Sequence, residues 1–160
     1  MNIFVLDYNP VVAAQAQCDK HIVKMCLETA QMLCTALHHH GVETEYKPTH
    51  VNHPCNVWVR ENKANFLWLC EHGVELCREY TSRYKKIHKC ESVIWSAQWK
   101  SESLPEGCLT PFAQAMPDQY KNACAVEAYR NYYTNEKLRF ATWRKNKPDW
   151  VGGADEMAWL

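Results

Sequence analysis

Residues 17–37, QCDKHIVKMCLETAQMLCTAL, carry two sets of side chains at helical spacing. The apolar set recurs every three or four positions, which is typical of a stripe that faces a core: Ile22, Cys26, Ala30, Leu33 and Leu37. Hydrogen-bonding groups repeat at the same steps and form a second stripe: His21, Lys24, Glu28, Gln31 and Thr35. The polar side of a surface helix usually carries repeated Lys and Glu, and this stripe differs from that pattern. The segment therefore predicts a long amphipathic helix whose polar side is a candidate functional face.

The rest of the chain predicts further helices and loops. We expect helices over residues 11–38 (with a break allowed near Asp19), 55–84, 91–100 and 118–144. An extended segment over 2–6 precedes them, and a loop containing Pro105, Pro111 and Pro117 spans 101–117. Gly73 is expected to mark a close helix–helix approach, and the tail 149–160 to dock through its Trp residues. The predicted class is all-α, a single compact bundle of about four main helices over residues 1–160.

Composition narrows the function classes. The chain has 160 residues, enough for one domain with a core, and its 18 basic and 18 acidic residues cancel. No global field favours nucleic acid, although a local basic patch on a neutral protein can hold phosphates. Nine cysteines without a C-x-x-C pair, no signal peptide and no long apolar run predict a reduced, cytoplasmic protein with no membrane partner.

Several common catalytic motifs are missing from the sequence. It contains no G-x-x-x-x-G-K-[ST] phosphate loop, no G-x-G-x-x-G, no G-x-S-x-G and no H-E-x-x-H. These absences argue against the usual kinases, dinucleotide oxidoreductases and serine hydrolases. We expect no cofactor.

The polar stripe is the first candidate site. Glu28 lies on it between Lys24 and Gln31, with His21 two turns earlier and Asp19 about a turn from His21 and Lys24. A partly buried carboxylate beside cations can act as a general acid or base. The alternative is a solvated face on which Lys24 and Glu28 form a weak i,i+4 pair.

The second candidate lies at the start of the helix expected from residue 55. His53, Asn56 and Arg60 are expected to bind an anion such as a phosphate, because a helix N-terminus favours negative charge. Zinc held by His50, His53 and Cys55 is an alternative. A structural zinc site needs four ligands, usually as two close pairs, so we favour no metal.

Mixed basic and aromatic residues in 80–89 and 129–145 form the third candidate. Such mixtures suit phosphate neutralisation and base stacking. The alternative is a charged surface whose aromatic rings point inward. The candidate nucleic-acid contacts are Arg83, Tyr84, Lys85, Lys86, Lys89, Tyr129, Arg130 and Tyr132.

These residues together resemble two groups of proteins. One is a group of small phage-encoded proteins, which shares these positions: Asn9-Pro10, Cys18 to His21, Lys24-Met25, Glu28 to Gln31, Lys47 to His50, His53 to Cys55, Trp58, Glu79 to Tyr84 and His88-Lys89. The more distant group is the phage pyrimidine-dimer DNA glycosylases, compact all-α enzymes whose early helix carries Asp-x-His and, seven residues past the His, a catalytic Glu. Asp19, His21 and Glu28 keep that spacing.

The resemblance implies that Glu28 is the catalytic carboxylate, supports attack at C1′ of a deoxyribose and stabilises the positive charge that develops there. It also implies a DNA-contacting role for the segment around Tyr129 to Tyr133, and the cytoplasm of an infected bacterium as location. That family attacks with the α-amine of a small residue exposed when Met1 is removed. Asn2 disfavours this removal, so we expect Met1 to stay and its amine to serve if it lies near Glu28. Leu27 and Gln31 replace the family's arginines.

Three functions follow as hypotheses. The first is an enzyme that acts on DNA or nucleotides, with a DNA glycosylase-like activity at a pyrimidine glycosidic bond, Asp19 and His21 orienting Glu28. The second is a phage transferase that hypermodifies DNA bases, using the same pocket. The third is a non-enzymatic protein that sequesters a nucleotide or inhibits a host protein.

Overall fold

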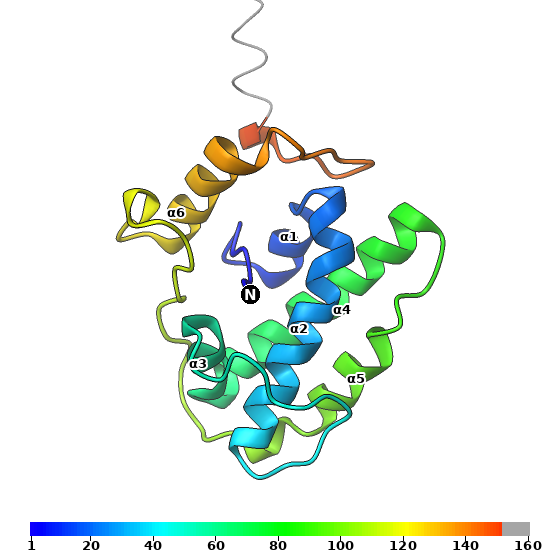
Figure 1. Ribbon diagram of the computed structural model, residues 1–160, viewed down its shortest axis with the longest axis vertical. Coiled ribbons are helices and arrows are strands. Elements are labelled where there is room, and N and C mark those ends of the chain that lie inside the picture. Colours follow the sequence, from blue (N-terminus) through cyan, green and yellow to red (C-terminus); the bar gives the residue numbers. More distant parts are fainter. Residues whose placement is uncertain (152–160) are drawn as a thin grey trace, which may run out of the picture.

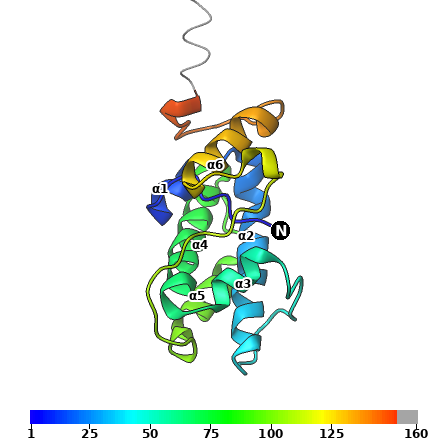
Figure 2. The same cartoon turned by 90° about the vertical axis from the view of Figure 1, so that its left-hand side faces the viewer.

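Two long antiparallel helices form the centre of the computed structural model, which describes residues 1–151. These are α2 (Asp19–His39) and α4 (Lys63–Tyr84), which lie side by side in both views (Figures 1 and 2). A Cβ added at Gly73 of α4 would lie 2.8 Å from Cγ2 of Thr29 in α2. The predicted close approach at Gly73 is therefore confirmed. α5 (Glu91–Trp99) packs against both long helices.

The amino-terminal segment lies inside the molecule. Residues 3–6 are at most 6% exposed, and they run between α2 and the carboxy-terminal elements before α1 (Pro10–Gln15) begins (Figure 1). Asn9 starts α1, because its side chain accepts the backbone N–H of Val11 at 2.9 Å. α1 then packs on α4. The first residues of the chain are therefore buried beside α2 and do not lie at the surface.

The all-α class is confirmed, because regular structure in residues 1–151 is entirely helical. The allowed break near Asp19 is present, since α1 and α2 are separate helices. The helix expected over 91–100 and the loop over 101–117 are also confirmed, with one 3₁₀ turn at Ser101–Ser103. None of the helices in this part of the chain has the length and apolar character needed to cross a membrane.

The single helix predicted over 55–84 is wrong. The structure has α3 (Pro54–Arg60) and α4 as separate helices. Asn62 divides them, because it takes an extended conformation and its side chain accepts the backbone N–H of Asn65 at 2.9 Å. This bond satisfies one of the free donors at the start of α4, which makes a new helix start favourable.

The helix predicted over 118–144 is also wrong. A 3₁₀ turn (Asp118–Tyr120) precedes α6 (Ala125–Tyr132), and a π-helical turn (Tyr133–Lys137) follows it. Gln114 prevents a helix at 121–124, because its amide exchanges two hydrogen bonds with the backbone of Asn122. The chain beyond the π-turn is irregular up to residue 148. Trp150 packs against the core, whereas the rest of the expected tail docking falls outside the described residues.

Candidate active site

The amino terminus meets Glu28 on the polar side of α2. The Met1 α-amine lies 3.3 Å from Oε1 of Glu28, and the backbone N–H of Asn2 donates to the same oxygen at 3.1 Å. Lys24, one turn earlier and exposed, places its Nζ 3.6 Å from the other carboxylate oxygen. Glu28 is only 8% exposed. A largely buried carboxylate therefore joins an α-amine to a lysine at the edge of solvent.

His21 holds the amino-terminal segment in place. Its ring stacks on Phe4 with centroids 4.4 Å apart, and its Nδ1 and the Tyr133 hydroxyl form a hydrogen bond of 2.6 Å. Burial, together with the positive charges of Lys137 and Lys24, lowers the pKa of His21 to about 4. His21 is therefore neutral at neutral pH. It contacts the amino-terminal segment through Phe4, and no hydrogen bond within residues 1–151 joins it to Glu28.

His53 is the second histidine near the amino terminus. It precedes α3, and its Nδ1 accepts the backbone N–H of Cys55 at 3.1 Å, so the neutral ring carries its hydrogen on Nε2. Burial lowers the pKa of His53, and the charges of the amino terminus and His50 lower it further, while Glu28 opposes them. His53 is thus a neutral donor within electrostatic reach of both the α-amine and Glu28.

The sequence matches a model of a known protein family. The model described as pyrimidine dimer DNA glycosylase matches residues 1–92, more than half of the 160 residues. The chain belongs to the pyrimidine dimer DNA glycosylase family. No curated protein and no solved structure matches it. At the level of this family the function is DNA glycosylase-like and the substrate is DNA.

The part that matches the pyrimidine dimer DNA glycosylases holds Met1, Glu28 and His53, and the rest of the chain supplies their support. Tyr133, which bonds His21, lies outside the match. So does Lys137, whose Nζ lies 4.8 Å from the centre of the Tyr132 ring. Sequence reasoning missed Lys137 as a neighbour of His21, because no local pattern links a π-turn to a helix more than a hundred residues earlier.

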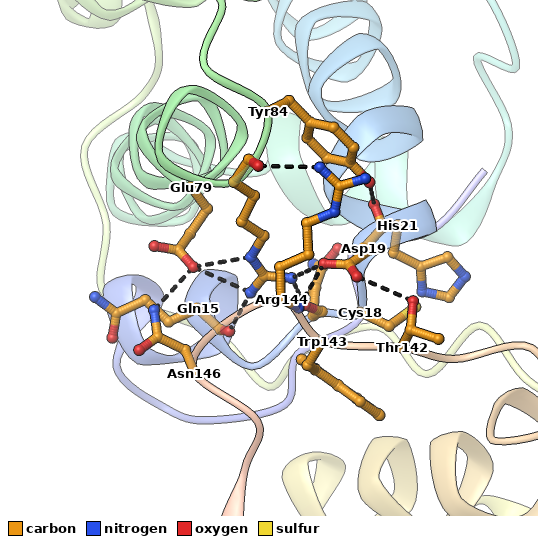
Figure 3. Close-up of polar contacts among 12 residues, drawn as sticks. Gln15, Cys18, Asp19, His21, Glu79, Tyr84, Thr142, Trp143, Arg144 and Asn146 are labelled. Carbon is orange, nitrogen blue, oxygen red and sulfur yellow. Dashed lines mark hydrogen bonds and ion pairs between the residues drawn. The ribbon is translucent and has the colours of Figure 1, made fainter.

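Asp19 has its hydrogen-bond partners away from Glu28 in this glycosylase-family structure, and its predicted orienting role stays a prediction. Its carboxylate accepts from Arg83 Nη1 at 3.1 Å, from the Arg144 backbone N–H at 3.1 Å and from the Thr142 hydroxyl at 2.9 Å (Figure 3). Arg83 also donates to Glu79 from Nη2 at 3.0 Å. The cluster joins α2, α4 and the segment 142–146, which makes it a buried structural ion network.

Several predicted contacts with substrate are occupied within the fold. Arg83 and Tyr129 are 5% and 0% exposed, so neither fits the predicted role at a DNA surface. Asn56 is buried and donates to the carbonyls of Thr49 and His50 at 3.2 and 2.7 Å. Arg60 ends α3 and donates to the carbonyl of Val51. Asn56 and Arg60 thus hold the loop before α3, and the anion site predicted from them with His53 gains no support from these contacts.

Other predicted residues stay at or near the surface. Arg130 is half-buried and donates to the Leu6 carbonyl at 2.9 Å and to Asp7 at 3.2 Å. Tyr84 donates to the Asp19 carbonyl at 3.2 Å, and Gln31 lies half-buried one turn after Glu28. The lysines that follow α4 are exposed: Lys85, Lys86 and Lys89. In the described part of the chain no group of three His, Cys, Asp or Glu is arranged to hold a metal ion.

Proposed function

We propose that this protein is a DNA glycosylase that acts at a pyrimidine glycosidic bond, with Glu28 as its catalytic carboxylate. The contact of 3.3 Å between the Met1 α-amine and Glu28 Oε1 carries the proposal. It joins a nucleophile to a proton acceptor, which is the arrangement that covalent catalysis by an amine needs. Family membership supports DNA as the substrate.

The chemistry follows from these two groups. The α-amine gives a proton to Glu28, and its lone pair attacks C1′ of the deoxyribose. The bond from C1′ to the base nitrogen breaks, and its electron pair leaves with the base, which takes up the proton that the attacking nitrogen releases. The C1′–O4′ bond of the resulting aminal then opens to a protonated imine on O4′ protonation. Glu28, neutral after it takes the proton of the amine, gives this proton to O4′, and its restored negative charge then stabilises the protonated imine.

The lysines beside this site support DNA binding. Lys20 and Lys24 are exposed on α2, and Lys24 lies next to Glu28. His88 hydrogen bonds with the carbonyl of Val23 at 3.2 Å, which brings the segment 85–89 with its exposed lysines against α2. Lysines gathered along one face can neutralise successive phosphates on a protein of zero net charge. We infer that the backbone of DNA contacts the exposed lysines of α2 and of the segment after α4.

The proposal is tested on ultraviolet-irradiated, undamaged and base-modified DNA, with and without borohydride. Base release with a trapped protein–DNA adduct is the expected result on at least one DNA. Glu28→Gln should abolish both, whereas Glu71→Gln, which changes an exposed carboxylate of α4, should keep both. If no DNA gives a released base, a strand break or an adduct, the proposal is refuted. A binder that sequesters nucleotides would instead keep its affinity in Glu28→Gln.

A further inference from the structure

Two backbone nitrogens compete for one carboxylate oxygen at the site. Met1 N and Asn2 N lie 3.3 and 3.1 Å from Glu28 Oε1. With Met1 present, Asn2 N is an amide whose lone pair is delocalised, so only the Met1 amine can attack. With Met1 removed, Asn2 N would be the terminal amine at almost the same place. The distances alone therefore do not decide which amine reacts.

The side chain of Met1 decides in favour of its retention. It is 2% exposed and packs against the core, although the residue as a whole is only half-buried. The accessible surface of Met1 therefore belongs to its backbone, which includes the amine. Met1 thus has a buried side chain that anchors it and an α-amine that a substrate can reach. Removal of Met1 would take the anchor away and leave a gap in the packing.

Asn2 shapes the chain that carries this amine. Its side-chain oxygen accepts the backbone N–H groups of Ile3 at 2.7 Å and Phe4 at 3.1 Å, and its Nδ2 donates to the carbonyl of Ala115 at 2.8 Å. These bonds form a turn of the Asx kind pinned to the loop after α5. Phe4 completes the turn with a φ of 59°, stacked on His21. The turn directs both Met1 N and Asn2 N toward Glu28.

We propose that the reacting amine belongs to a retained Met1 and that Asn2 is the positioning residue for it. This inference rests on the proposed function. Asn2 has two effects: its size prevents the removal of Met1, which requires a small second residue, and its hydrogen bonds set the direction of the Met1 amine. A chain with Ser or Thr at this position would lose Met1 and present a different amine.

Variants at position 2 separate the two effects. Asn2→Leu keeps Met1 but loses all three side-chain hydrogen bonds. Asn2→Asp also keeps Met1 and still accepts from Ile3 and Phe4. Asn2→Ser is trimmed to an amino-terminal Ser. Asn131→Leu, at an exposed asparagine of α6, is the matched control. Each protein is measured by intact mass, by DNA affinity, by base release at saturating DNA and by peptide mapping of the borohydride adduct.

Wild-type protein should contain Met1, and its adduct should map to the Met1 α-nitrogen. Asn2→Leu should lose about a hundredfold in the rate at saturating DNA with unchanged affinity, because a displacement of about 1 Å has that effect. Asn2→Asp keeps the bonds from Ile3 and Phe4 and should therefore retain most of the rate that Asn2→Leu loses. A residue with a merely structural role would not show this difference in rate at unchanged affinity. Base release by wild-type protein without Met1, an adduct on another nitrogen, or full activity of Asn2→Leu would overturn this inference alone. Inactivity on every DNA would overturn the proposed function with it.

Discussion

Arg83→Met is expected to lower the free energy of unfolding by about 4 kcal/mol. The guanidinium has no exposed surface, and its five N–H donors reach Asp19, Glu79 and the carbonyls of Gln15 and Gln17. Loss of one partner from a buried ion pair typically costs about 3–5 kcal/mol. Two carboxylates lose a partner here, but Asp19 keeps Thr142 and the Arg144 N–H. We therefore expect a loss of unfolding free energy near the middle of this range.

The measurement is urea unfolding followed by circular dichroism, with the slope checked for two-state behaviour. A loss of about 4 kcal/mol in a chain of this size corresponds to a fall in Tm of about 8–16 °C. Arg78→Met is the matched control, because Arg78 is 63% exposed and pairs with Glu75 at 3.5 Å. It should change stability by less than about 1 kcal/mol. A change below about 1 kcal/mol in Arg83→Met would refute the structural reading of the cluster.

Three further predictions concern the packing at Gly73, the stability of the fold at low pH and the salt dependence of DNA binding. Gly73→Ala should destabilise by about 1–3 kcal/mol, because the new Cβ meets Thr29 Cγ2 at 2.8 Å; adding Thr29→Ser, which removes that methyl group, should restore part of the loss in urea unfolding. Burial lowers the pKa of His21 and His72 to about 4, so each contributes stability that is complete above about pH 6.5 and is lost as the pH falls to about 4. The loss is on the order of 3 kcal/mol for each histidine, and His72→Asn should flatten that part of a stability–pH curve; an unchanged curve would contradict the assignment. Lys89→Ala should reduce the slope of log affinity for DNA against log salt by about 1, and an unchanged slope would remove Lys89 from the DNA-binding face.

The core side of α2 could be predicted from sequence because helical periodicity is a local property. All five residues of the apolar stripe are fully buried: Ile22, Cys26, Ala30, Leu33 and Leu37. The polar side could not be predicted in the same detail. Spacing shows that His21, Lys24 and Glu28 share a side, but not what covers them. The amino-terminal segment covers His21 and Glu28 and leaves Lys24 exposed.

Contacts between residues that are distant in sequence could not be predicted from the sequence. Asp19 and Arg83 are 64 residues apart, and Asp19 and Thr142 are 123 apart, so no local pattern indicates that they meet. The irregular segment after residue 137 takes its shape from these contacts with Asp19. The break before α4 is different, because Asn62 is a favoured helix-capping residue and the signal was present in the sequence.

The site combines residues inside and outside the part of the chain that matches the family model. Met1, Glu28 and His53 all lie within the 92 residues that match the glycosylase family. The groups that hold the amine in place come from outside the match: the Ala115 carbonyl bonds Asn2, and Tyr133 bonds His21, which stacks on Phe4. The α-amine is on a chain end with no helix of its own, so these distant contacts determine where it points. We therefore infer that the reacting groups are specified by the first part of the chain and their geometry by the second.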